Sequence, residues 1–116
     1  MKEGIVLFAH GSRDASWAKP FEDIAAQLSA EYPVRLAFLE QMKPTLHEAI
    51  AALAAEGVRA IRVVPLFLGA GGHVKDDLPP LVSAARAAHP GLAITLEDPI
   101  GERPEVIVAI ADALRR

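Results

Sequence analysis

Residues 4–13 read GIVLFAHGSR, an apolar run that stops at a histidine and then turns through glycine. Residues 63–73 read VVPLFLGAGGH and repeat this arrangement with a longer glycine-rich turn. A short apolar run bounded by turn residues is typical of a buried strand. A strand that ends in this way can hold an imidazole ring at the edge of a sheet. Two such arrangements in one small chain suggest a metal site or an acid/base pair.

Apolar runs alternate with helical patterns along the whole chain. Strands are expected at about residues 4–9, 34–39, 60–68 and 92–96. Helices are expected at about residues 15–31, from Thr45 to a C-cap at Gly57, at 78–88 and at 102–114. Thr45 and Glu48 form a capping-box pattern at the start of the second helix, and Pro79 falls in the first turn of the third.

This βαβαβαβα order predicts an α/β fold, a flavodoxin-like three-layer α/β/α sandwich with a four-stranded parallel sheet. The expected strand order is 2-1-3-4, and near-continuous apolar strands fit a sheet that is covered on both faces. The chain has 116 residues and no linker, so residues 1–116 are expected to form one domain.

Composition narrows the function classes. The net charge of −3 and an aromatic content of 5% argue against a nucleic-acid partner. The chain has no cysteine, which excludes disulfides and thiolate metal sites, so any metal would be bound by imidazole, carboxylate or water. The sequence has neither a signal-peptide pattern nor an apolar run long enough to span a membrane, and a cytoplasmic protein is expected.

Three side chains are expected at one edge of the sheet. Ligands of open α/β sheets bind outside the carboxyl ends of the strands. His10 ends the first strand, Glu40 ends the second and His73 follows the third in its loop. Two imidazoles and a carboxylate are an ordinary ligand set for a divalent metal. His73 precedes a helix N-terminus, whose positive end keeps the imidazole neutral. One such histidine is more often structural, but the set together favours function.

Other residues have two readings each. Arg13, Lys43 and Lys75 either pair with acidic groups of a substrate or are solvated surface charges. The glycines Gly69, Gly71 and Gly72 are expected to let the backbone approach a ligand closely; Val74 breaks the G-x-G-x-x-G pattern, so nucleotide binding is not supported. Asp76 and Asp77 are expected to be helix caps, His47 and His89 surface residues, and Trp17 and Phe21 core residues or the lining of a large flat pocket.

Three blocks of sequence, residues 8–14 (FAHGSRD), 38–46 (FLEQMKPTL) and 65–79 (PLFLGAGGHVKDDLP), occur in order. Together they resemble the small CbiX-type sirohydrochlorin chelatases, the CbiX/SirB family of the class II chelatase superfamily. The resemblance covers nearly the whole chain. It implies an enzyme that inserts Co²⁺ or Fe²⁺, less readily Ni²⁺, into the tetrapyrrole sirohydrochlorin without a nucleotide, for cobalamin or siroheme biosynthesis.

The resemblance also implies roles for individual residues. The metal-binding and catalytic residues of the family map onto His10, His73 and Glu40, and the residues around them become candidates for substrate contacts: Ser12, Arg13, Lys43, Gly71, Gly72 and Lys75. Many relatives are about twice as long and contain two such domains that face each other, whereas the short members form homodimers. A homodimer is therefore expected here.

Two other function classes stay open. One is a non-catalytic metal- or tetrapyrrole-binding module that has kept the ligands. The other is a phosphoryl-transfer enzyme with His10 as its nucleophile. The second would need several arginines around His10 to bind phosphate, and only Arg13 is close in sequence.

Overall fold

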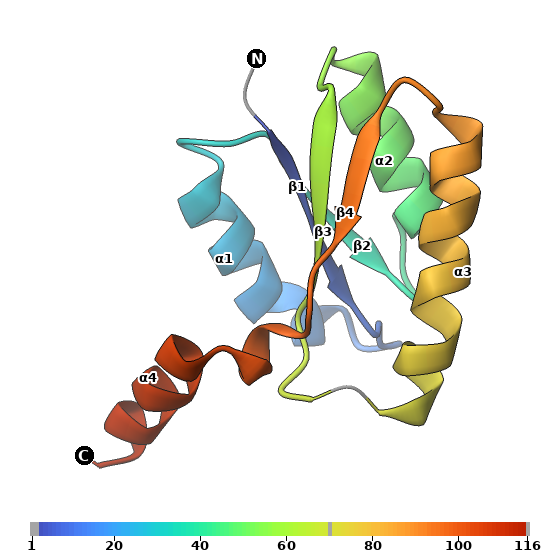
Figure 1. Cartoon of the computed structure of the whole chain (residues 1–116). Helices are drawn as coiled ribbons and strands as arrows, with labels where there is room; N and C mark the ends of the chain where they lie inside the picture. The colour runs from blue at the N-terminus through green and yellow to red at the C-terminus, as the bar shows by residue number, and fades with distance from the viewer. Residues whose placement is uncertain (1–2, 70, 116) are drawn as a thin grey trace.

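The computed structural model describes residues 3–69 and 71–115, and for residues 72–74 it describes the backbone alone. Its four strands are β1 (Gly4–Ala9), β2 (Val34–Phe38), β3 (Ala60–Pro65) and β4 (Ala93–Leu96). They form one parallel sheet in the order β2-β1-β3-β4, which confirms the predicted fold class and strand order. Helices α2 (Leu46–Ala55) and α3 (Gly72–Ala88) cover one face of the sheet, and α1 (Lys19–Leu28) lies on the other (Figure 1).

The larger part of the core lies between the sheet and the α2/α3 pair. Alternate strand residues such as Val6, Phe8 and Val63 face these helices and are fully buried. Ile50 and Leu53 of α2 fill the opposite side of the same cluster. Burial of this apolar surface is the main favourable term in the free energy of folding.

The predicted start of α2 is confirmed, and the helix ends at Ala55 with Glu56 rather than Gly57 as its C-cap residue. The Thr45 side chain accepts a hydrogen bond from the Glu48 backbone N–H at 3.2 Å, and Glu48 Oε1 accepts one from the Thr45 N–H at 2.9 Å, which completes the capping box. Gly57, just after the helix, has a φ of 92°, the left-handed conformation that glycine adopts at helix ends.

Helix α3 differs from the sequence prediction. It was expected at about residues 78–88, with Pro79 in its first turn, but it begins at Gly72 and contains Pro79 and Pro80 in its interior. Asp76 and Asp77 therefore lie within the helix, and the prediction that they cap it is wrong. A proline costs a helix one backbone hydrogen bond. Here the helix also buries Leu78 and residues further along the same face, and tertiary packing overrides local propensity.

The first predicted helix is divided in two. A 3₁₀ helix, η1 (Ala15–Ala18), precedes α1, and α1 ends at Leu28 rather than near residue 31. Pro20 lies in the first turn of α1, where its missing N–H costs nothing. Strand β3 is also shorter than predicted and ends at Pro65, which has no N–H to donate to a ladder.

The C-terminal segment leaves the body of the molecule. After β4, a short 3₁₀ helix, η2 (Ile100–Glu102), leads into α4 (Pro104–Leu114), which projects away from the sheet below α1 (Figure 1). No residue of α4 is buried. In the described ranges, none of the helices has the length and apolar character needed to cross a membrane.

Candidate functional site

The structure brings His10 and Glu40 together at the carboxyl edge of the sheet. His10 follows β1, Glu40 follows β2, and these strands are parallel neighbours. The backbone ladder continues beyond both strands, since the Glu40 N–H donates to the His10 carbonyl oxygen at 3.1 Å. The side chains follow the backbone: His10 Nε2 lies 3.7 Å from Glu40 Oε1, and the two side chains are 45% and 53% exposed. Both groups are therefore adjacent and accessible to an incoming ion or substrate.

Gly11 makes this approach possible. Its φ is +102°, a conformation that residues with a Cβ rarely adopt. A Cβ at this position would stand 1.8 Å from the Glu40 carbonyl oxygen, closer than any non-bonded contact allows. The glycine after the histidine therefore lets the turn after β1 lie directly against the turn after β2.

Several polar residues of the two turns already have partners within the chain. Arg13 Nε donates to Gln41 Oε1 at 3.3 Å, which links the turns after β1 and β2. The Ser12 hydroxyl accepts from the backbone N–H of Asp14 at 3.1 Å. Lys43 Nζ lies 3.9 Å from Glu48 Oε2, and its side chain is 84% exposed. Arg13 and Lys43 thus lie in the two turns that carry His10 and Glu40, each with a partner on its neighbouring segment.

An aromatic cluster packs near the end of β1, where His10 follows. The Trp17 ring centroid lies 4.7 Å from that of Phe21 and 6.3 Å from that of Phe38. These side chains pack against Ala9, the residue before His10. Trp17 and Phe21 are only half-buried, so they are outer core residues that also leave part of an apolar surface exposed.

His73 has a different backbone position from the one expected. It is the second residue of α3 and does not precede the helix in a loop. The first turn is still where the positive end of the helix dipole acts. The side chain of His73 lies outside the described residues, so its part in a metal site stays a prediction. Gly71 is exposed at the N-cap, and Gly72 opens the helix. Among the side chains that are described, no three metal-ligating residues form a cluster.

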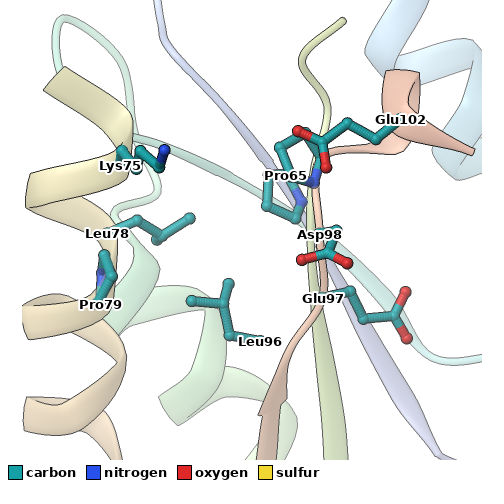
Figure 2. A pocket seen from close by; sticks show the side chains of 9 residues that line it. Pro65, Lys75, Leu78, Pro79, Leu96, Glu97, Asp98 and Glu102 are labelled. Atoms are coloured by element: carbon teal, nitrogen blue, oxygen red, sulfur yellow. The ribbon is translucent and has the colours of Figure 1, made fainter. Parts of the chain in front are cut away.

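A pocket of about 350 Å³ opens farther along the same edge, between α3 and the chain that follows β4. Figure 2 shows Lys75 on α3 on one side of it and Asp98 and Glu102 on the other. It is lined by Pro65, Lys75, Leu78, Pro79, Leu96, Glu97, Asp98, Pro99 and Glu102. His10 and Glu40 do not line it, so this pocket and the His10–Glu40 pair are two separate features of one edge.

The acidic residues of this pocket were missed by the sequence analysis. Glu97 and Asp98 follow β4 just as His10 follows β1 and Glu40 follows β2. The rule that ligands meet the carboxyl ends of strands, applied to the fourth strand, would have pointed to them.

Glu97 is held by two arginines. It accepts from Arg62 Nη1 at 3.0 Å and also pairs with Arg103 at the start of α4. Partial burial of the Arg62 guanidinium by itself lowers its pKa, but hydrogen bonds and charge from Glu97 and Glu3 outweigh that effect and raise the pKa. Arg62 therefore stays charged and fixes Glu97, which makes Glu97 a structural member of the pocket.

The two remaining histidines lie in the first turn of α2 and just after α3. His47 is exposed, as expected, but His89 is half-buried, and its Nε2 has no hydrogen-bond partner within the described residues. The two rings lie 6.3 Å apart between centroids. The expectation that His89 is a surface residue is therefore wrong, because its position at the end of α3 packs it against the chain near α2.

Comparison with known proteins identifies relatives of the chain. The family model CbiX matches residues 4–116. A sirohydrochlorin cobaltochelatase of Methanosarcina acetivorans is 39% identical over 85 residues, which are 71% of this chain and 65% of the relative. A sirohydrochlorin ferrochelatase of Bacillus subtilis is 33% identical over 115 residues, which are 95% of this chain and 43% of the relative. The matched part of the chain thus spans less than two thirds of each of these relatives.

Solved structures give the same result. A protein from Marinobacter aquaeolei VT8, described as a CbiX protein of cobalamin biosynthesis, has a TM-score of 0.86 and 36% identity, over 98% of this chain and 95% of that one. The sirohydrochlorin chelatase SirB of Bacillus subtilis subspecies spizizenii, in complex with cobalt, has a TM-score of 0.84 and 29% identity, over 99% of this chain and 50% of that one. The chain belongs to the CbiX family.

Proposed function

We propose that this protein is a sirohydrochlorin chelatase that inserts Co²⁺ or Fe²⁺ into the macrocycle without a nucleotide. The observation that carries the proposal is the accessible His10–Glu40 pair, with 3.7 Å between Nε2 and Oε1, in a member of the CbiX family. Relatives with cobaltochelatase and ferrochelatase names support both metals. Both ions accept nitrogen and oxygen ligands, so the ligand set alone does not choose between them.

Metal insertion replaces two pyrrole N–H protons by one divalent ion, so the site has to bind the ion and accept protons. In our proposal His10 and His73 bind the incoming metal through neutral imidazoles. Glu40 is either a further ligand or the group that takes up a proton. Of the two protons released, the His10 imidazole can take up one once the ion has passed from it to the macrocycle, and Glu40 or water can take up the other; both then pass to solvent.

The charges around the pair suggest how the substrate is oriented. Arg13 and Lys43 lie in the turns that carry His10 and Glu40, and Lys75 lines the neighbouring pocket. In our proposal these cations attract the acidic side chains that the family resemblance implies for the substrate, while Ser12, Gly71 and Gly72 contact it through their loops. The aromatic surface of Trp17 and Phe21 suits the flat face of a macrocycle.

The site of a single chain is one-sided, and we propose that two copies form a homodimer. One CbiX-type domain supplies a single wall for a large flat substrate. The solved SirB chain, of which this chain matches 50%, is about twice as long and supports the idea that a second copy supplies the other wall. A cytoplasmic location completes the proposal, because a chain with no cysteine needs no oxidising compartment.

The test is anaerobic insertion of Co²⁺ and Fe²⁺ into sirohydrochlorin, followed by absorbance. Replacing the proton acceptor or ligand, in His10→Ala and Glu40→Gln, is expected to lower the rate at least about 100-fold, the range typical of general acid–base groups. His47→Ala is the matched control, since His47 is an exposed histidine on α2, and it should keep the parent rate.

Two outcomes would overturn this assignment. Unchanged turnover in His10→Ala would exclude His10 from the chemistry. Tight binding of Co²⁺ or sirohydrochlorin by the folded parent, without turnover with either metal, would favour the non-catalytic binding module instead.

A further inference from the structure

Two histidines that take no part in the candidate active site lie close together. His47 is in the first turn of α2 and His89 directly follows α3, and these two helices lie side by side on one face of the sheet (Figure 1). The centroids of the two imidazole rings are 6.3 Å apart, with 37° between the ring planes. Imidazole is the commonest protein ligand of transition metals, and this chain has no cysteine to compete with it.

One nitrogen of the His89 ring has no role in the packing of the chain. Nε2 is buried, and it has no hydrogen-bond partner among the described residues. Buried polar atoms without a partner are rare in folded proteins, and a binding site for a water or an ion is one of their causes. A neutral imidazole whose Nε2 carries no proton offers its lone pair there, which is the form in which histidine binds a metal.

The separation of the two rings fits one shared ion. A metal bound at about 2.1 Å from a ring nitrogen lies about 3.2 Å from the ring centroid, so two rings on one ion have centroids about 5 to 6.4 Å apart, depending on the bond angle. The 6.3 Å between His47 and His89 lies at the upper end of this range. The His47 side chain is exposed, so a small rotation of its ring brings the pair to a bent, tetrahedral arrangement.

A pocket opens beside His89. It has a volume of about 470 Å³ and is lined by Ala54, Gly57, Val58, Arg59, Ala88, His89, Pro90, Gly91 and Leu92. Residues 57–59 lead into β3 and residues 90–92 lead into β4, so the pocket lies at the amino ends of these strands. It brings solvent, and with it dissolved ions, to the ring of His89.

The charges near the pair are compatible with a cation. The Thr45 backbone N–H lowers the pKa of the Glu48 carboxyl, and attraction to His47 adds a smaller effect in the same direction. A positive charge at His47 therefore has an ionised carboxylate beside it. Arg59 lines the pocket, but its side chain is exposed and its charge is screened by water and salt.

We propose that His47 and His89 form a second metal site, which holds one divalent transition ion such as Zn²⁺, Ni²⁺ or Co²⁺ between the two imidazoles. No third metal-ligating side chain joins them in the described part of the chain, so water completes the coordination sphere. The ion belongs to the chemical class that the proposed reaction consumes, but the site does not depend on that reaction.

Titration calorimetry of the full chain with Zn²⁺ tests the pair. The background is His10→Ala/His73→Ala, which removes the two imidazoles of the candidate active site. We expect one ion per chain in this background, and adding His47→Ala or His89→Asn should weaken the Kd at least about tenfold. Ala88→Ser is the matched control, because it changes an exposed neighbour and keeps both imidazoles, and its Kd should stay within about twofold.

Three results would overturn the shared site. They are no binding of Zn²⁺ in the background, binding that survives both His47→Ala and His89→Asn, and a loss in only one of the two, because a shared ion needs both rings. Circular dichroism checks that each variant is folded. If His89→Asn does not fold, His47→Ala decides by itself, since it changes an exposed side chain.

Histidine NMR spectra of the same background give a second readout that does not need the His89 variant. Substoichiometric Co²⁺ should broaden the ring signals of His47 and His89 together, and broadening of one ring alone would contradict a shared ion. The chelatase proposal is tested separately by insertion at excess metal. His47→Ala should keep the parent rate there, because the second site takes no part in the chemistry.

Discussion

The two faces of the sheet are built differently. The face under α2 and α3 is closed, with fully buried residues such as Phe8, Ile50 and Leu53. The face under α1 has a smaller buried cluster around Leu7 and Val64 and an open groove beside it. The closed face therefore supplies most of the stability of one chain, whereas the open face has apolar surface left for association. The His10–Glu40 pair lies at the edge where the two faces meet.

The largest loss of stability is expected when core volume is removed from the closed face. Leu53 is fully buried on α2, so Leu53→Ala is expected to lower the free energy of unfolding by about 2–5 kcal/mol. Ile24→Ala, on the open face, removes a side chain that is 41% exposed and should cost less than about 1 kcal/mol at low protein concentration. Urea unfolding of both variants measures the difference.

Equal losses for Leu53→Ala and Ile24→Ala would contradict the division between the faces. If the stability lost in Ile24→Ala grows with protein concentration, the open face is stabilised by a partner, because stability that depends on a partner follows mass action.

A second prediction concerns the edge between the faces. Gly11→Ala places a Cβ against the Glu40 carbonyl oxygen at a φ of +102° and should cost about 1–3 kcal/mol of stability. It should also weaken Co²⁺ binding, because the turn has to move away from Glu40. Gly91→Ala is the matched control: nothing lies within 4 Å of the position its Cβ would take, and its effect should stay within about 0.5 kcal/mol. Unfolding curves and metal titration measure both variants, and equal effects would refute the steric argument.

The smallest change in stability is expected at acidic pH and comes from two carboxylates at helix caps, Glu48 at the start of α2 and Asp14 at the start of η1. The Thr45 backbone N–H donates to Glu48 and, with weaker help from the Lys43 charge, lowers the pKa of Glu48 below its ordinary value of 4.5. The Ser16 hydroxyl and N–H lower the pKa of Asp14 in the same way. A carboxylate with a depressed pKa in the folded state stabilises it above the ordinary pKa, and this contribution is lost as the pH falls through the folded value.

Glu48→Gln and Asp14→Asn keep the cap shape but remove the titration, so each variant should flatten the dependence of stability on pH below about 5. Thermal unfolding from pH 3 to 7 measures this, and curves that run parallel to the parent curve would show that these caps do not contribute.

Much of the fold could be predicted because its signals are local. The apolar runs give the strands, and the Thr45/Glu48 capping box and Gly57 give both ends of α2. The start of α3 was missed because proline was read by its local preference for the first turn, while burial of Leu78 keeps the helix continuous through Pro79. The edge rule for parallel strands placed Glu40 near His10, although the same rule was not applied to Glu97 and Asp98 after β4.

The sequence alone was enough to predict the alternation of strands and helices, the parallel sheet and the residues at its carboxyl edge. Each of these depends only on periodicity and chain order. Only the tertiary structure decided the 3.7 Å approach of His10 to Glu40, the ion pairs that hold Glu97 and the outward course of α4. These features depend on contacts between residues far apart in sequence, and no local pattern carries their geometry.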